Sequence, residues 1–217
     1  MPLFPRWTNT VSRLSGVLML ALPAVAIAGL MIVVRSTWGT KQNREVVQPI
    51  EFDHRHHVGD EGIDCRYCHY TVEKSPYPGL PSTTICMSCH AQVWNKSPLL
   101  GLVREYYFKD RPIPWNSVHN LPDYVYFNHA IHVNKGVGCV TCHGRVDQMA
   151  LVQQKSPLSM GWCVDCHRNP EPQLRPVEYI TSMTWQPDPG VDRQRLGAQL
   201  AQQYNVHTRI SCDACHR

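Results

Sequence analysis

The chain has 217 residues, of which 43% are hydrophobic and 9% aromatic, and 17 are prolines. Many of the apolar residues sit in one N-terminal run, so the remainder lacks the apolar surface that a conventional core requires. The formal net charge of +4 is mild and dispersed, and we expect no nucleic-acid partner. The 10 cysteines and 12 histidines point to another source of stability.

The N-terminal run extends from Leu14 to Val34 and contains no charged residue. At 1.5 Å per residue it is long enough to cross a hydrocarbon core of roughly 30 Å. A cleaved signal peptide would have a shorter apolar region, although Ala26-Ile27-Ala28 fits a cleavage site. We predict an anchor over residues 1–36, with an uncleaved transmembrane helix at about 14–34. On either interpretation, everything after Arg35 lies on the outer, periplasmic side of the cytoplasmic membrane.

All ten cysteines occur in five copies of the pattern Cys-x-x-Cys-His, numbered here as motifs 1 to 5 in chain order. The first and second cysteines of each copy are Cys65 and Cys68, Cys86 and Cys89, Cys139 and Cys142, Cys163 and Cys166, and Cys212 and Cys215. The histidines that follow them are His69, His90, His143, His167 and His216.

This spacing suits covalent haem attachment. Two thiols separated by two residues reach the two vinyl groups on one edge of haem, and the adjacent histidine then lies under the ring as the proximal iron ligand. Structural zinc needs no histidine after every second cysteine, and disulfides would not explain the histidines. The sequence therefore predicts five covalently bound haem c groups, held by ten thioethers and five proximal histidines.

Seven histidines remain for the distal side of the irons: His54, His56, His57, His119, His129, His132 and His207. Four of them fall in a pattern, Phe-x-His-x-x-His, that occurs at residues 52–57 and 127–132, each time just upstream of a haem motif. Residues three apart share one face of a helix but diverge somewhat. One histidine can therefore turn to the haem downstream while its neighbour reaches an adjacent haem. We predict His54, His57, His129 and His132 as distal ligands.

The fifth distal ligand is less defined. We favour His119, with Met183 next, since a methionine ligand would raise the potential of its haem, and His207 as a further alternative. His56 is expected behind a ligand or at the surface. Because the histidines suffice to cap every iron on both sides, the sequence indicates an electron carrier with no catalytic residues of its own and not an enzyme with an open iron site.

A duplication organises the exported domain, which we predict over residues 37–217. A two-haem module at 52–90 recurs at 127–167, with offsets of 74 to 77 residues, and a fifth haem follows at 212–216. Residues 97–111 and 191–204 favour helices, and the proline-rich stretch 168–190 favours an extended path. The predicted fold class is a multihaem cytochrome c. One N-terminal transmembrane helix precedes a loop-rich, mainly α, haem-centred domain with little sheet.

The Phe-x-His-x-x-His pattern upstream of Cys-x-x-Cys-His resembles cytochromes of the tetrahaem c3 and trihaem c7 type. The strings FDHRHHVGDEGIDCRYCHYTVEKSPYPGLPSTTICMSCH and VHNLPDYVYFNHAIHVNKGVGCVTCHGRVDQM are further similar to the pentahaem subunit of alternative complex III. That complex is a bacterial quinol oxidoreductase of the respiratory chain, unrelated to the cytochrome bc complexes. The resemblance covers nearly the whole chain. It supports the distal role of the five histidines inside the strings, which are His54, His57, His119, His129 and His132.

The resemblance implies partners and a function. The expected partners are an iron–sulfur subunit similar to molybdopterin enzymes, polytopic quinol-binding membrane subunits and a monohaem cytochrome c. Electrons would pass from quinol through iron–sulfur clusters and five haems to a periplasmic acceptor, either a soluble carrier or a terminal oxidase.

Two other functions stay open. A single-helix multihaem quinol dehydrogenase would oxidise quinol at its own haem, whereas a relay subunit would be inert without its membrane partners. A multihaem reductase enzyme would need a five-coordinate iron, which would give a high-spin ferric signal that responds to added ligands.

Overall fold

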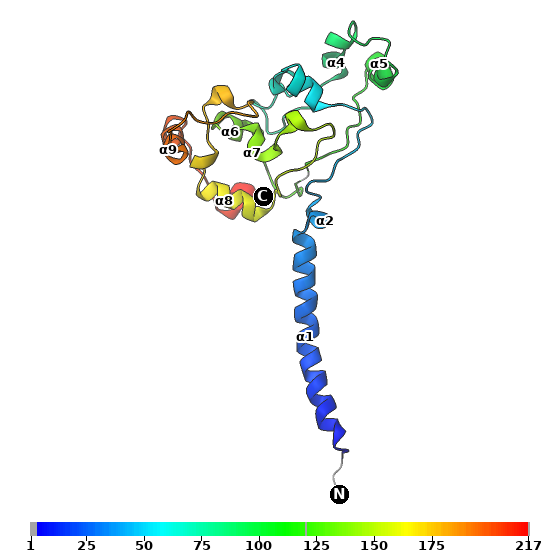
Figure 1. Ribbon diagram of the computed structural model, residues 1–217, viewed down its shortest axis with the longest axis vertical. Coiled ribbons are helices and arrows are strands. Elements are labelled where there is room, and N and C mark those ends of the chain that lie inside the picture. Colours follow the sequence, from blue (N-terminus) through cyan, green and yellow to red (C-terminus); the bar gives the residue numbers. More distant parts are fainter. Residues whose placement is uncertain (1–3, 120, 217) are drawn as a thin grey trace. The chain divides into compact units, whose positions relative to one another are not determined.

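The computed structural model describes residues 4–119 and 121–216 (Figure 1). Residues 1–3 of the predicted anchor, residue 120, and residue 217 at the end of the predicted haem domain lie outside this description. The chain divides into two compact units, Met1–Gln42 and Asn43–Arg217.

The first unit is built on one long helix, α1 (Trp7–Arg35), which is followed by the short helix α2 (Thr37–Thr40). The 29 residues of α1 have an apolar window with a mean hydropathy of 2.8, which is long and apolar enough to cross a membrane. The helix begins seven residues before the uncharged run because Arg13 and its polar neighbours are compatible with helix. Gly39 of α2 lies against the Val33 carbonyl, where a Cβ would come within 2.7 Å of the oxygen.

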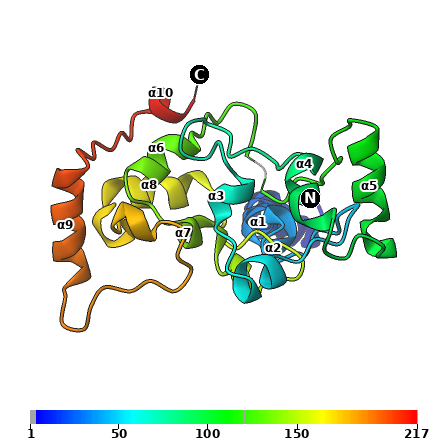
Figure 2. The ribbon, with the colours of Figure 1, turned by 90° about the horizontal axis from the view of Figure 1, so that it is seen from above.

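The second unit consists of short helices joined by long loops (Figure 2). Its α-helices are α3 (Cys65–Cys68), α4 (Thr83–His90), α5 (Gly101–Phe108), α6 (His129–Asn134), α7 (Cys139–His143), α8 (Met160–Arg168), α9 (Arg193–Gln203) and α10 (Cys212–Cys215). One π-helix, η1 (Arg55–Asp60), and four 3₁₀ turns complete the set: η2 (Pro98–Leu100), η3 (Val146–Gln148), η4 (Glu171–Gln173) and η5 (Val177–Tyr179). In the described part of the chain, strand pairing is confined to isolated bridges, such as Val137 with Leu174.

Side-chain caps start several of the helices that matter for the haem motifs. Asp64 caps α3 by accepting a hydrogen bond from the Arg66 amide at 2.9 Å. Asn128 caps α6 and Ser159 caps α8 in the same way. A side-chain oxygen at this position satisfies an amide that has no partner within the helix. These caps fix where the helices of motifs 1 and 4, and the helix of His129 and His132, begin.

The hydrophobic core is small. One cluster consists of Ile50, Val103 and Ile113, with Met87 and Trp115 packed against it. The remaining buried apolar residues are Val133, Met149, Leu174, Ile180, Met183 and Leu200, which are spread over the whole domain. A chain of this length normally buries a larger core, so another group must supply the missing apolar contacts.

Two elements differ in detail from the sequence-based expectations. The first Phe-x-His-x-x-His segment winds as a π-helix, in which the Glu61 amide bonds to the His56 carbonyl. Gly59 of this turn lies so close to the Asp147 carbonyl that a Cβ would clash at 2.6 Å. The proline-rich stretch at 168–190 contains the two single turns η4 and η5 within its extended path.

Candidate functional site

The five haem motifs all lie in or at the end of helical turns: α3, α4, α7, α8 and α10. Residues three apart on a helix share one face, so the two cysteines of a motif face the same side. All ten cysteines are free thiols, and none is paired in a disulfide. Each motif therefore presents two thiols together, as attachment to one haem edge requires.

Four of the five predicted proximal histidines have Nδ1 held by a backbone carbonyl. The bonds run from His69 to Gly79 at 2.8 Å, from His90 to Val93 at 3.1 Å, from His167 to Arg209 at 2.8 Å and from His216 to Tyr124 at 3.1 Å. A carbonyl can only accept, so Nδ1 carries the proton and Nε2 keeps its lone pair. This is the arrangement that orients an imidazole for metal ligation and fixes its tautomer.

The two Phe-x-His-x-x-His segments adopt the same local geometry. The rings of Phe52 and His54 lie edge to face, with their centres 4.7 Å apart and their planes at 86°. The rings of Phe127 and His129 do the same, with centres 4.7 Å apart and planes at 88°. In each segment the phenylalanine stacks on the second histidine, at 4.3 Å for His57 and 4.5 Å for His132. The repeat in the sequence is therefore also a repeat in the structure.

Three of the predicted distal rings face a proximal ring across a gap that fits an iron atom. The ring centres of His57 and His90 are 6.2 Å apart, those of His129 and His143 are 6.4 Å apart, and those of His132 and His167 are 6.0 Å apart. A metal–imidazole bond is about 2 Å long and the ring centre lies about 1 Å beyond the bonded nitrogen, so two imidazoles on one iron have centres about 6 Å apart.

The distal histidines are oriented through the same kind of bond. Nδ1 donates to the Asp53 carbonyl in His57, to the Pro76 carbonyl in His129 and to the Asn128 carbonyl in His132, each at 2.8 Å. His54 is the exception, because its Nδ1 is buried with no hydrogen-bond partner.

Burial keeps the central histidines neutral. Desolvation lowers the pKa of His54 to about 4, and the charge on His69 adds to this effect. Desolvation, followed by the charges on His119 and His129, lowers the pKa of His143 to about 3. Burial also lowers the pKa of His119, His129 and His132. Metal ligation requires the neutral imidazole, so this environment favours the ligating form.

The remaining predicted ligands have different surroundings. His119 places Nε2 3.2 Å from Nδ1 of His143, and the two ring centres are 4.4 Å apart, which is too close for an iron atom between them. His207 is exposed and bonds to Oδ1 of Asn205 at 2.7 Å. His56 is also exposed and stacks on Trp94.

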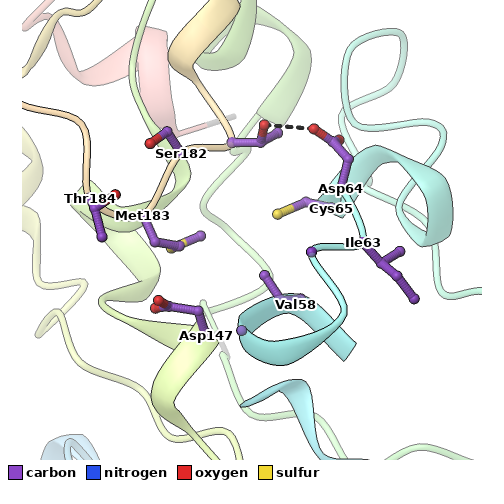
Figure 3. Close-up of a pocket in the computed structure, with 11 residues that line it drawn as sticks. Val58, Ile63, Asp64, Cys65, Asp147, Ser182, Met183 and Thr184 are labelled. Atoms are coloured by element: carbon purple, nitrogen blue, oxygen red, sulfur yellow. Dashed lines mark hydrogen bonds between the residues drawn. The ribbon is translucent and has the colours of Figure 1, made fainter. Parts of the chain in front are cut away.

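Met183 is 9% exposed and lines a cavity of about 270 Å³ (Figure 3). Cys65 of motif 1 lines the same cavity, together with Asp64 and Asp147. The structure thus brings Met183 to the first haem motif and not to the fifth.

The residues around the motifs fit a large apolar group. Val93 and Trp94, just after motif 2, are 57% and 60% exposed, and Met160, just before motif 4, is 67% exposed. Apolar side chains gathered next to paired thiols and iron-spaced imidazoles are what a porphyrin would cover. Together with the small core, this arrangement fits haem at the motifs.

Sequence reasoning missed the groups that hold the histidines in place. The carbonyls of Gly79, Tyr124 and Arg209 come from loops whose sequences carry no ligand signal. Every residue has a carbonyl, so no residue type marks these positions. The contact of His119 with His143 also had no local signal, since the two are 24 residues apart.

Comparison with known proteins agrees with this geometry. Residues 125–217 match the family described as cytochrome c7 and related cytochrome c. This part of the chain is thus similar to a multihaem cytochrome c7-type domain, and the described residues are mostly helical and loop-rich, with one apolar helix near the N-terminus. The predicted fold class is thereby confirmed. A domain of this class binds haem c covalently.

One curated relative can be named. A stretch of 97 residues is 39% identical to the multiheme cytochrome c subunit of menaquinone reductase from Nitratidesulfovibrio vulgaris. The aligned stretch covers 44% of this chain and 45% of the relative, so the chain spans less than half of the length of the relative it matches.

Proposed function

We propose that this chain is a membrane-anchored electron-relay subunit that holds five haem c groups and serves a quinone oxidoreductase. The observation that carries the proposal is the set of three imidazole pairs whose ring centres lie 6.0 to 6.4 Å apart, each pair including the histidine of a haem motif. An iron capped on both sides has no position for substrate, so it exchanges electrons only. The chain is then not an enzyme by itself.

We assign each residue that would hold a haem one of three roles: thioether formation, proximal ligation or distal ligation. In each motif the two cysteines form the thioethers and the following histidine is the proximal ligand. The proposed distal partners are His54 for motif 1, His57 for motif 2, His129 for motif 3 and His132 for motif 4. The fifth distal ligand stays a prediction among His119, Met183 and His207, of which Met183 lies beside Cys65 of motif 1 and His119 beside His143 of motif 3. Haem supplies the one-electron chemistry, and the protein sets ligand identity, orientation and burial.

Within this function we propose membership of alternative complex III. The support is the similarity of the two long strings in the chain to its pentahaem subunit. The proposed partners are the iron–sulfur/molybdopterin-like subunit, the polytopic quinol-binding subunits and the monohaem cytochrome c of such a complex. The name of the curated relative favours a second candidate, a complex in which electrons run toward menaquinone. A relay of haems whose irons have two axial ligands can carry electrons in either direction, because electron tunnelling is reversible.

For α1 we propose the role of an uncleaved anchor, with the haem domain of residues 37–217 on the periplasmic face. The length and hydropathy of α1 support this role. Protease added to intact spheroplasts should digest the haem domain and leave a small membrane-bound fragment that contains α1. Recovery of the haem domain in the soluble periplasmic fraction, with a new N-terminus after residue 28, would instead indicate a signal sequence.

The haem count and the partners are tested on the native protein. Intact mass and a pyridine haemochrome assay should give five haems per chain, and far fewer would contradict the proposal. Gentle solubilisation of native membranes should then copurify the iron–sulfur and polytopic subunits together with quinol-dependent reduction of the haems. A preparation of the chain alone that oxidises quinol would favour the single-helix quinol dehydrogenase.

A further inference from the structure

We infer that the five motifs lie side by side in the order 2–1–3–4–5, so that motifs 2 and 5 form the two ends of the row. This inference rests on the proposed function and deepens it, since it sets the route that electrons take when each motif holds a haem. The spatial order departs from the chain order because motif 1 lies inside the row and motif 2 at its end. Four separate contacts carry the argument.

Motifs 1 and 2 are joined directly by a hydrogen bond. Tyr67 stands between the cysteines of motif 1 and Ser88 between those of motif 2, and their hydroxyl oxygens are 2.9 Å apart. Helices α3 and α4 therefore carry adjacent motifs.

Motifs 1 and 3 are joined through the two adjacent residues Ile180 and Thr181. The amide of Cys139, the first cysteine of motif 3, donates a hydrogen bond to the Ile180 carbonyl at 3.0 Å. Oγ1 of Thr181 donates to Oδ2 of Asp64 at 2.8 Å, and Asp64 directly precedes the first cysteine of motif 1. The starts of both motifs are therefore held by the same short segment.

Motifs 3 and 4 share one helix. Helix α6 carries both His129 and His132. The ring centre of His129 is 6.4 Å from that of His143 in motif 3, and the ring centre of His132 is 6.0 Å from that of His167 in motif 4. Residues three apart are one turn apart on a helix, so the two irons would be capped from neighbouring positions.

Motifs 4 and 5 are linked by the chain that leads into motif 5. The proximal ring of motif 4, His167, donates from Nδ1 to the Arg209 carbonyl at 2.8 Å. Arg209 precedes the first cysteine of motif 5 by three residues.

Exposure identifies the same two ends independently. Cys89 of motif 2 and Cys212 of motif 5 are exposed, whereas the other eight cysteines are partly buried. In Figure 2, α4 and α8 lie on opposite sides of α3, and α10 lies on the side of α6 and α8. Motifs 2 and 5 are thus the places where an electron donor and an electron acceptor reach the row. Interior motifs 1, 3 and 4 pass electrons only to neighbours within the chain.

The test removes one haem at a time from the full-length loaded protein and follows intramolecular electron exchange by NMR of the haem methyl signals during partial reduction. One variant combines Cys139→Ala with Cys142→Ala and deletes interior motif 3. We expect loss of exchange between the haems of motifs 1 and 2 and those of motifs 4 and 5. The matched control combines Cys212→Ala with Cys215→Ala and deletes an end, and it should keep exchange among all four remaining haems.

Persistent exchange among all four haems after deletion of motif 3, or loss of exchange after deletion of motif 5, would overturn the order. Intact mass must show four haems in each variant. If a variant does not mature, the iron positions in an experimental structure of the unmodified loaded protein decide, and any other sequence of nearest iron neighbours rejects the inference. A count of five haems with low-spin irons in that unmodified protein tests the proposed function separately, so the two failures are distinguishable.

Discussion

Asp64 and Thr181 are hydrogen-bonded at 2.8 Å, from Thr181 Oγ1 to Asp64 Oδ2, across 117 residues of sequence. Asp64 also caps α3 and forms an ion pair with Arg66, whose Nε lies 2.9 Å from Oδ1. One carboxylate therefore starts the helix of motif 1 and ties it to the segment beside motif 3. The cavity that contains Met183 and Cys65 is formed at this junction.

We expect replacement of Asp64 by alanine to destabilise the domain. Loss of a helix cap costs about 0.5–2 kcal/mol, and loss of the bond to Thr181 adds about 1 kcal/mol. Thermal unfolding of the loaded protein, followed by haem absorbance, should show a lower midpoint. Asp60→Asn is the matched control, because the carboxylate of Asp60 is 73% exposed and interacts only weakly with His56. Equal midpoints for the two variants would contradict the structural role of Asp64.

The same carboxylate predicts a pH dependence of stability. Its hydrogen bond with Arg66 lowers the pKa of Asp64 to about 2. In the unfolded chain the pKa of an aspartate is about 3.9, so the stabilisation is fully present above that pH and is lost as the pH falls toward about 2. Unfolding titrations between these pH values should show a smaller pH dependence for Asp64→Asn than for the unmodified protein. An unchanged slope would mean that another carboxylate is responsible.

Adjacent histidines provide a test of iron ligation. His57→Ala should leave the iron of motif 2 with one protein ligand and give a high-spin ferric signal in electron paramagnetic resonance, since His57 faces His90 at 6.2 Å. His56→Ala should leave the spectrum low-spin, because the ring of His56 is exposed and stacks on Trp94. A high-spin signal in the His56 variant alone would reverse the assignment.

We expect His119 to be a hydrogen-bond partner of His143 and not the distal ligand of the iron that His143 binds. Its Nε2 lies 3.2 Å from Nδ1 of His143, so it accepts a hydrogen bond that increases the basicity of that ring. We expect His119→Ala to raise the midpoint potential of one haem without producing high-spin iron, as read by potentiometry and paramagnetic resonance together. A new high-spin signal would instead make His119 an iron ligand and remove Met183 and His207 from consideration.

The packing of α9 on η4 depends on Gly197. Its Cα faces the backbone of Glu171 so closely that a Cβ would overlap the carbonyl group. We expect Gly197→Ala to lower the free energy of unfolding by about 1–3 kcal/mol, the usual cost of overpacking, as measured by denaturant titration. Gly101→Ala in α5 is the control, since a Cβ there meets nothing within 4 Å and alanine favours helix. Similar losses for both would argue against tight packing at Gly197.

Much of the site could be read from the sequence because its chemistry is local. Two thiols and a histidine must stand within five residues to hold one haem, and two histidines three apart must share a helical turn. The repeat was recognisable for the same reason, and the stacking of Phe52 and Phe127 on their histidines shows that equal spacing gave equal geometry. The mainly helical, loop-rich fold followed from the short apolar segments and the prolines.

The rest depends on contacts between distant parts of the chain. The neighbours of each motif are set by how the loops pack, and the hydrogen bond between Thr181 and Asp64 has no counterpart in local spacing. The π-helical winding of η1 is tied to the approach of Gly59 to Asp147, which lies 88 residues further along the chain. Local patterns therefore predict the helical turns of the motifs and the repeated Phe-x-His-x-x-His geometry, whereas the neighbours of each motif depend on tertiary packing.

The long reach of these bonds has a consequence for how the protein is made. His216 is held by Tyr124 across 92 residues, and Gln48 pairs with Asn116 across 68. Contacts between such remote partners form slowly during folding, because a large loop must close before they are gained. The thiols consequently stay accessible in the open chain until these contacts form. That delay gives the attachment machinery the interval in which to load each porphyrin before the domain closes around it.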